Sequence, residues 1–313
     1  MRKPCESTRR WKQCTDRKPK CRTLNRKQLM DIEFAQKLCA LNNEFYETWA
    51  DSFSNTRHNA WPGWKRCLEE TRFFDSIKET APAPTSGKDG KIPLRILDVA
   101  CGNLRFETYL ANQRQPRKIA VKALDSCRTL AESADSIPSN ISVEFQRCDL
   151  ITSLQDNTLE NKLGFCAEQD NRNNISEAMK ADVTVSFGFM HHIPLMQWRI
   201  RFLEALLHAT KNDGYVCVSF WNFLNSPALA AKAKETHQQG IAYLDCNENQ
   251  FEEGDYLLGW RNEPGAFRYC HNFTPDEIET IVEALQPLAE CTTRFSSDGR
   301  TGNLNEYLVL KKR

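Results

Sequence analysis

Residues 94–106 read LRILDVACGNLRF, a short apolar run that ends near Asp98 and leads into a turn of small residues. This pattern predicts a buried strand, a tight turn and then a helix. The start of such a helix offers free backbone N–H groups to a carboxylate, and Asp98 can face a cationic amine. The stretch therefore predicts a binding site for a ligand that carries both groups.

Four further apolar runs continue this pattern along the chain. A helical stripe that includes Trp198, Phe202 and Leu206 lies between the last two of them. Short apolar strands that alternate with helices predict a mostly parallel sheet covered on both faces. The four runs are Ile119 to Leu124, Ile141 to Phe145, Val183 to Phe189 and Tyr215 to Trp221.

Acidic residues stand at the ends of the first three predicted strands, in the order Asp98, Asp125 and Asp149. A carboxylate at the second of these positions can accept hydrogen bonds from the hydroxyls of a ribose. Acidic residues are also common in the turns that follow strands, so each one alone could be a turn residue that binds no ligand. No Gly-x-Gly-x-x-Gly occurs, which makes a nicotinamide cofactor the weaker alternative.

The C-terminal part completes a domain that we assign to residues 81–313. A helix is predicted over Thr274 to Leu285, with Thr274 as its N-cap, and two closing strands over Leu288 to Phe295 and Glu306 to Lys311. The predicted fold is α/β, with a doubly wound, seven-stranded, mostly parallel sheet. Polar stretches near 152–180 and 223–251 interrupt the pattern and are read as insertions, the first of them as a mobile loop.

Residues 31–80 are predicted to form an N-terminal helical cap. Helices are expected over Leu29 to Phe53 and Cys67 to Ile77, with an aromatic stretch that holds Arg57 and His58 between them. Residues 1–30 contain eleven Lys and Arg but only two acids, although the net charge of the whole chain is +1. Such a basic arm can bind nucleic acid. A disordered tail, or a true start at Met30, are the alternative readings.

The thirteen cysteines of the chain include no Cys-x-x-Cys pair. Those in the basic arm lack the close spacing of a zinc site, so no metal site is predicted. No signal peptide and no apolar run of about 18 residues is apparent, so a membrane span is not expected. We read the cysteines as reduced and mostly buried, and we expect a cytoplasmic protein.

The turn after Asp98 resembles the first motif of class I methyltransferases, which bind S-adenosyl-L-methionine through an acidic-x-Gly-x-Gly-x-Gly sequence. Ala100 and Leu104 replace the outer glycines of that motif, and Gly102 remains. A tight strand–helix turn of another α/β protein can look the same. The cofactor residues predicted from this resemblance and from the row of acids are Asp98, Ala100, Gly102, Asn103, Asp125 and Asp149.

Four patches between about Asn43 and Lys312 resemble the tRNA wobble-uridine carboxymethyl methyltransferase family. The specific ones are Thr56-Arg57 with Trp61-Pro62, and Arg268-Tyr269 with His271 and Phe273, because generic class I enzymes lack them. The other two include Val185 to Ile193 with the helix beyond it, and the closing Gly302-Asn303 strand. The glycine motif, the insertions and the basic arm depart from the family pattern.

The resemblance implies methyl esterification of a 5-carboxymethyluridine in tRNA, and in eukaryotic family members a small activator subunit. A carboxylate acceptor is already ionised at neutral pH, so alignment and exclusion of water matter more than a base. Arg57 is predicted to fix the acceptor, and His191 or His192 to orient it. Because the side chains of adjacent residues project differently, at most one of the two histidines is expected to face the pocket. The aromatic wall is expected to include Phe53 and Trp64. The predicted substrate contacts are Trp61, Phe189, Trp221, Trp260, Arg268 and His271.

Two other functions stay open at this point. A small-molecule methyltransferase of the same fold would bind no tRNA and would use the stretch near 152–180 as a substrate lid. A catalytically silent binding protein is the reading that the replaced glycines favour. Because one fold of this kind serves many acceptors, the fold alone does not decide between them.

Overall fold

The structure is a computed structural model that describes residues 30–71, 93–113, 118–132, 137–165 and 177–313. The basic arm, the end of the second predicted helix and the loop near 81–93 therefore lie outside the described residues. The helices of the described part are α1 Ile32–Ser54, α2 Pro62–Glu70, α3 Arg105–Ala111, α4 Arg128–Glu132, α5 Leu150–Gln155, α6 Met196–His208, α7 Pro227–Leu244 and α8 Pro275–Leu285.

The predicted sheet is confirmed: the described residues form a seven-stranded sheet in the order β3-β2-β1-β4-β5-β9-β8. Strands β1 to β5 run parallel to one another, and β9 is antiparallel to both β5 and β8. Chain order reverses between β1 and β4, which is where ligands bind in open α/β sheets. The strands are β1 Leu94–Val99, β2 Ile119–Asp125, β3 Ile141–Arg147, β4 Ala181–Ser186, β5 Thr210–Trp221, β8 Ala289–Ser297 and β9 Asn305–Lys312.

Each face of the sheet carries its own apolar core, because strand side chains alternate between the two faces. One core joins Leu97 and Val99 of β1 to helices α5, α6 and α8. The other joins Ile96 of β1 to α2 and α3, which contribute Trp64 and Phe106. The near-continuous burial of β1, β2 and β4 is therefore explained by helices on both sides.

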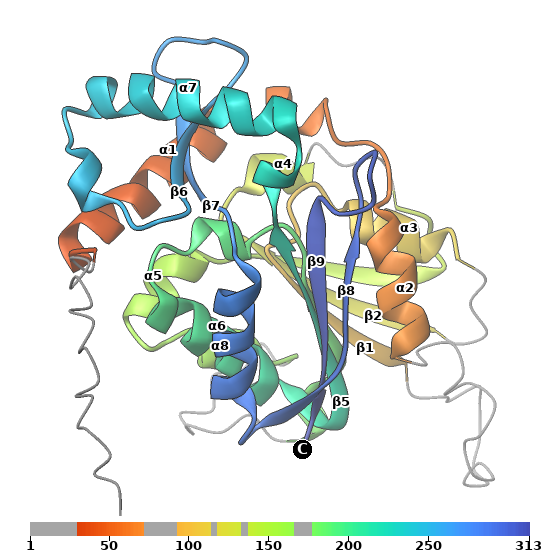
Figure 1. Ribbon diagram of the computed structural model, residues 1–313. Helices are drawn as coiled ribbons and strands as arrows, with labels where there is room; N and C mark the ends of the chain where they lie inside the picture. The colour runs from red at the N-terminus through yellow and green to blue at the C-terminus, as the bar shows by residue number, and fades with distance from the viewer. Residues whose placement is uncertain (1–29, 72–92, 114–117, 133–136, 166–176) are drawn as a thin grey trace, which may run out of the picture.

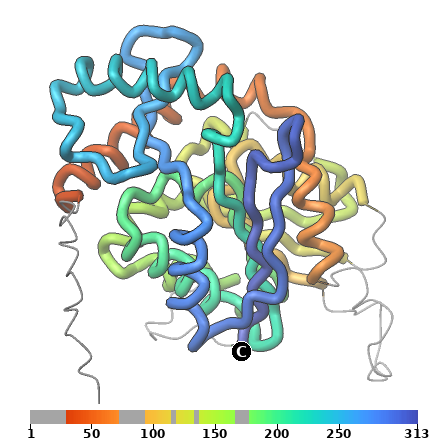
Figure 2. Tube along the Cα trace, viewed as in Figure 1, coloured from red at the N-terminus to blue at the C-terminus, as the bar shows by residue number. Residues whose placement is uncertain are grey.

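A cap covers the edge of the sheet where the parallel strands end. It consists of α1, α7 and an antiparallel hairpin of β6 Asp255–Gly259 and β7 Phe267–His271, which Figures 1 and 2 show above the sheet. The Nε1 atom of Trp260 in this hairpin donates a hydrogen bond to Ser52 of α1 at 3.0 Å. Segments more than 200 residues apart in sequence thereby form one structural unit.

Several predicted boundaries need correction. The fourth strand ends at Ser186 rather than at Phe189, so the residues beyond it belong to a loop and to the short 3-10 turn η4 Met190–His192. Helix α2 begins at Pro62 because proline is favoured in the first turn of a helix. The region near 223–251 was read as an insertion, but it contains α7, which packs on β6, and the hairpin itself was not predicted.

The region near 152–180 was read as an insertion or mobile loop, and its described part packs against the domain. Helix α5 covers its beginning, and Leu159 and Leu163 beyond the helix are 2% and 0% exposed. The 3-10 turns η2 Glu160–Lys162 and η3 Glu177–Met179 continue the segment. Lys122 Nζ donates to the Lys162 carbonyl at 3.0 Å and ties the segment to β2. The segment is polar in overall composition, so the importance of the two buried leucines could not be seen from the sequence.

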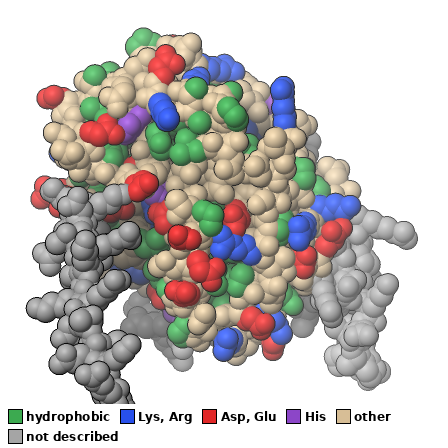
Figure 3. Space-filling view, viewed as in Figure 1, with side chains coloured by type: hydrophobic (Ala, Val, Ile, Leu, Met, Phe, Trp, Pro, Cys, Tyr) green, Lys and Arg blue, Asp and Glu red, His purple; other side chains and the backbone are tan. Residues whose placement is uncertain are grey.

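The surface shows no single dominant charge on the face drawn in Figure 3, where acidic and basic side chains are interspersed. This agrees with the net charge of +1 for the whole chain. None of the helices in the described residues is long and apolar enough to cross a membrane.

Candidate functional site

A cavity of about 720 Å³ lies between the cap and the carboxyl ends of the parallel strands. This volume falls in the range of cofactor and substrate sites. Fourteen of the fifteen side chains that the sequence predicts for the site border it. The predicted site residues that border it are Arg57, Trp61, Asp98, Ala100, Gly102, Asn103, Asp125, Asp149, Phe189, His191, His192, Trp221, Trp260 and Arg268.

The turn after β1 keeps the backbone of a three-glycine motif although only one glycine is present. Ala100, Gly102 and Leu104 have φ angles of 68°, 57° and 54°, all in the left-handed region. That region costs non-glycine residues roughly 1–2 kcal/mol each. Ala100 and Leu104 therefore keep a backbone conformation that their side chains disfavour. Such strain is typical of turns at functional sites.

The row of acids lies along the sheet side of the cavity. Asp125 accepts hydrogen bonds from the backbone N–H groups of Gly102 and Cys127, both at 2.9 Å. Asp149 caps α5 by accepting from the N–H of Thr152 at 3.0 Å. Burial raises the pKa of Asp125, and the N–H donors act in the opposite direction. Each acid therefore has a structural bond, and each still faces the cavity.

Asn103 has a different local role from the predicted one. Its side-chain amide donates to Ser54 Oγ at 3.0 Å and to the Arg57 carbonyl at 3.1 Å. It thus fastens the turn after β1 to the end of α1. Arg105 continues this connection by donating to the Asn59 carbonyl at 2.8 Å. Both side chains border the cavity, and Arg105 was not predicted as a site residue.

A buried carboxyl pair at the end of β1 was only half predicted. Asp98 is 2% exposed and borders the cavity, and Glu107, one turn into α3, is 0% exposed. The Oδ1 atom of Asp98 and both carboxyl oxygens of Glu107 have no hydrogen-bond donor among the described residues. Sequence reasoning missed Glu107, although a glutamate among the apolar positions of a short helix is the signal that marks it.

Aromatic rings form one wall of the cavity, as predicted. Trp61 and Trp64 lie 5.5 Å apart between ring centroids, and Trp64 packs on Phe187 at 5.9 Å. Gly188 has a φ of 76°, and a Cβ there would lie 3.0 Å from the Trp61 ring. Only glycine combines this backbone with so close an approach. The cap and the loop after β4 can therefore meet directly at Trp61.

Two guanidinium groups occupy the cap side of the cavity. Arg57 lies over the Phe53 ring at 3.5 Å, and burial, followed by the charge of Arg268, lowers the pKa of Arg57 to about 10. Arg268 is 5% exposed, with its Cζ atom 5.5 Å from the centroid of the Trp260 ring. Neither Nε nor Nη1 of Arg268 has a hydrogen-bond acceptor among the described residues. Arg57 therefore stays charged at neutral pH.

Both predicted histidines border the cavity, which corrects the expectation that at most one would face it. Burial, then the charge of Arg268, lowers the pKa of His192 to about 3. Its Nδ1 lies 3.0 Å from the Tyr269 carbonyl and its Nε2 lies 2.9 Å from the Tyr46 hydroxyl. The amide nitrogen of Asn42 also lies 3.1 Å from this Nδ1, so both ring nitrogens of His192 have polar partners.

His191 differs from His192 because its Nδ1 is buried without a hydrogen-bond partner in the described part of the chain. Its ring lies 5.0 Å from that of Trp221. Burial and the neighbouring His192 lower its pKa well below the ordinary value, so it is neutral. Of the two histidines, His191 is therefore the one with a free ring nitrogen for a ligand. Tyr46, the partner of His192, also borders the cavity and was not predicted from the sequence.

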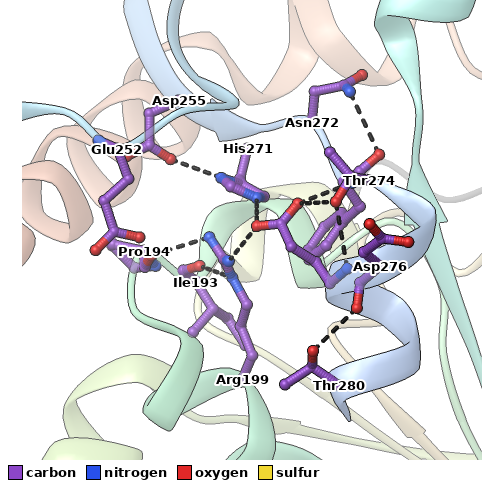
Figure 4. A network of polar contacts seen from close by, with 12 residues as sticks. Ile193, Pro194, Arg199, Glu252, Asp255, His271, Asn272, Thr274, Asp276 and Thr280 are labelled. Atoms are coloured by element: carbon purple, nitrogen blue, oxygen red, sulfur yellow. Dashed lines mark hydrogen bonds and ion pairs between the residues drawn. The ribbon is translucent and has the colours of Figure 1, made fainter. Parts of the chain in front are cut away.

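His271 was predicted as a substrate contact, and the structure corrects this. It is 0% exposed and does not border the cavity. Its Nδ1 lies 2.7 Å from Asp255, as Figure 4 shows, and its Nε2 lies 3.0 Å from Glu277. Arg199 lies 3.8 Å from Glu277 and donates to the Ile193 carbonyl at 2.8 Å. This network joins β7 and α8 to the loop that carries the histidines, so His271 has a structural role.

A grouping of His191, His192 and Cys270 has the spacing of metal ligands in the described residues. Both ring nitrogens of His192 already have partners, and Arg268 is close enough to influence both histidines and Cys270 electrostatically. Burial raises the pKa of Cys270 to about 11, so the thiol keeps its proton. A nearby cation and a protonated thiol both oppose metal binding, and we assign no metal here.

The charges in the cavity are therefore separated. Acids from β1, β2 and the start of α5 lie on the sheet side, and the guanidinium groups of the cap lie opposite, with neutral histidines near them. Such a site favours a cationic ligand next to the sheet and an anionic ligand next to the cap.

Comparisons with known proteins concern the fold. No protein-family model and no curated protein matches the chain. Among solved structures, a methyltransferase dependent on S-adenosylmethionine from Methanosarcina mazei is 16% identical, with a TM-score of 0.47 over 71% of this chain and 92% of that one. One from Anabaena variabilis is 16% identical, with a TM-score of 0.43 over 91% and 98% of the two chains. The chain is also similar to an amino pentose methyltransferase from Micromonospora echinaspora, at 11% identity and a TM-score of 0.41 over 80% and 92%.

Proposed function

We propose that this protein transfers a methyl group from S-adenosyl-L-methionine to a carboxylate. The observation that supports this best is Arg268, a buried guanidinium with two free donor atoms beside the cavity. A planar guanidinium binds a carboxylate through two parallel hydrogen bonds. Arg57 lies beside it, and the electrostatic coupling between the two arginines in the cap would be relieved by an anionic ligand.

The residues on the sheet side fit the methyl donor. Asp98 has a free buried oxygen for an ammonium group, and Asp125 lies where ribose hydroxyls are held at the end of a second strand. When bound, S-adenosylmethionine supplies a methyl carbon on a sulfonium, which a carboxylate oxygen attacks in line. Trp61, Trp64 and Phe189 exclude water from this region, and no side chain needs to remove a proton from an ionised acceptor.

For the acceptor molecule, we propose a carboxymethylated uridine in tRNA, on the basis of the sequence resemblance. Unpaired bases can stack on aromatic side chains such as Trp61 and Trp260, while basic residues hold the backbone. Lys232 and Arg261 at the border of the cavity are candidates for that contact. The basic arm and an activator subunit remain part of this proposal, and so does a cytoplasmic location.

The first experiment measures binding of S-adenosylmethionine to the purified chain by calorimetry. Transfer of labelled methyl groups to total tRNA is then followed, and the product is treated with mild alkali. A methyl ester releases its label as volatile methanol, whereas a methyl group on nitrogen or carbon is retained. Retained label would refute a carboxylate acceptor, and absence of label in RNA despite donor binding would favour a small-molecule acceptor.

A further inference from the structure

Glu107 forms a buried pair with Asp98 that the proposed reaction does not otherwise use. Asp98 comes from the end of β1 and Glu107 from α3, so the two carboxyl groups meet where the strand passes into the helix. They are 2% and 0% exposed, and only Asp98 borders the cavity. One carboxyl group therefore faces a ligand, and the other stands behind it.

The two carboxyl groups require a proton between them. Asp98 Oδ1 and both carboxyl oxygens of Glu107 lack a hydrogen-bond donor in the described part of the chain, and two carboxylates offer only acceptors. Each group shifts the pKa of the other, so the two lie close together, and a hydrogen bond between them can form only when one group carries a proton. The other ionisable groups that act on the pair are Asp125 on β2 and the thiol of Cys101, and neither supplies a positive charge.

Burial acts on the pair in the same direction. It raises the pKa of Asp98 well above the ordinary value, together with repulsion from Glu107 and Asp125. Burial also raises the pKa of Glu107, to about 7. Adjacent carboxyl groups titrate as a pair, so the free protein holds two protons on this pair below neutral pH and one above it.

We propose that Glu107 is a positioning residue that keeps one proton on the pair and donates it to the Asp98 carboxylate when an ammonium group binds there. This inference rests on the proposed function, because the ammonium is that of the methyl donor. Below neutral pH, binding converts a neutral pair into a singly charged one and releases one proton to the solvent. Above neutral pH, the free pair already carries one negative charge, and binding releases none.

The proposal predicts a specific pH dependence of donor affinity. The affinity should rise about tenfold per pH unit up to neutral pH and then become constant, because one proton is released only in the lower range. In Glu107→Gln, the amide replaces the shared proton as a permanent donor to Asp98. This variant should bind the donor more tightly than the wild type at pH 6 and equally well at pH 8. A merely structural role for Glu107 would weaken binding at both values.

The test is calorimetry of S-adenosylmethionine binding at pH 6 and pH 8, in buffers of different ionisation enthalpy. These buffers report the number of protons released. Glu132→Gln serves as the control, because Glu132 is exposed and pairs with the exposed Arg128 on the surface. The control should keep the proton release of the wild type at pH 6, and Glu107→Gln should lose it. Equal pH slopes in the wild type and Glu107→Gln would overturn the inference while the proposed function stands.

A second measurement separates the two proposals if the donor fails to bind. Carbon NMR titration of the free, full-length protein reports the carboxyl groups directly. A carboxyl resonance that titrates near neutral pH in the wild type and is absent from Glu107→Gln supports the shared proton, even if the proposed methyl donor is wrong. Ordinary titration of both groups near pH 4 would refute the pair without reference to any ligand.

Discussion

Replacement of Arg268 by Met should abolish most of the activity while leaving the folded protein as stable as before. The free Nε and Nη1 atoms of Arg268 can each make a charge-assisted hydrogen bond to an acceptor carboxylate. Such a bond contributes roughly 1.5–3 kcal/mol. Loss of both would raise the barrier by about 3–5 kcal/mol, which lowers kcat/KM by about two to four orders of magnitude.

The stability side of this prediction follows from the surroundings of Arg268. Its guanidinium is buried near the rings of Phe45, Phe53 and Trp260, without a carboxylate partner in the described residues. An apolar side chain of similar length fits such a place, and replacement of buried charges by apolar residues is often neutral or stabilising. The melting temperature of Arg268→Met should therefore stay equal or rise by a few degrees.

The assay combines kcat/KM for the acceptor at saturating donor, donor affinity by calorimetry, and thermal unfolding. Arg66→Met is the matched control, because Arg66 also lies over an aromatic ring, 4.1 Å from the centroid of Phe295, but is exposed to solvent and does not border the cavity. It should retain activity within about tenfold. The reasoning is refuted if Arg268→Met keeps its activity, or if it unfolds at a clearly lower temperature, since Arg268 would then support the fold.

Three further predictions concern the frame of the site. Gly102→Ala should lower the free energy of unfolding by about 1 kcal/mol in urea titrations. The cost comes from the backbone, because Gly102 has a φ of 57°, and not from a clash, because nothing lies within 4 Å of a Cβ there. An unchanged free energy would mean that the turn relaxes. Burial raises the pKa of Glu277, but His271 and Thr274 together outweigh it and lower the pKa to about 2. Its contribution to stability is therefore present above about pH 4.5 and lost as the pH falls towards 2, and urea unfolding at pH 6 and pH 3 should show a larger loss for the wild type than for Glu277→Gln. Asp298→Ala should weaken the attachment of α2, because Asp298 accepts a hydrogen bond from the Gly63 N–H at 3.0 Å. The rate of amide hydrogen exchange should therefore rise more in α2 than in α8. Equal rises in the two helices would contradict a local role.

The sheet and the donor side could be predicted from the sequence because their signals are local. An apolar run, a tight turn and an acid at a strand end all lie within about ten residues, and the structure confirms β1 with its predicted bounds, Leu94–Val99. The helix after Thr274 was equally clear, since the capping box with Glu277 is a contiguous pattern. In both cases the physical cause lies in neighbouring residues, so no tertiary information was needed.

The acceptor side was harder because its residues meet only through the tertiary fold. The patch from Arg268 to Phe273 suggested that Arg268 and His271 act together, but side chains alternate along β7. Arg268 therefore borders the cavity, whereas His271 points into the network of Asp255 and Glu277. A period of two along the strand would have separated them, had the hairpin been recognised. The contact of Glu107 with Asp98 has no comparable local signal.

The two halves of the site come from different parts of the architecture, and this has a consequence for specificity. Donor-side groups such as Asp98 and Asp125 end strands of the sheet, whereas Arg57, Trp260 and Arg268 belong to α1, its continuation and the β6–β7 hairpin. Because the hydrogen bond from Trp260 to Ser52 joins the hairpin to α1, the acceptor side is assembled as one unit. Under the proposed function, a change of acceptor would therefore need changes mainly in the cap, and the free donors of Arg268 favour an anion there.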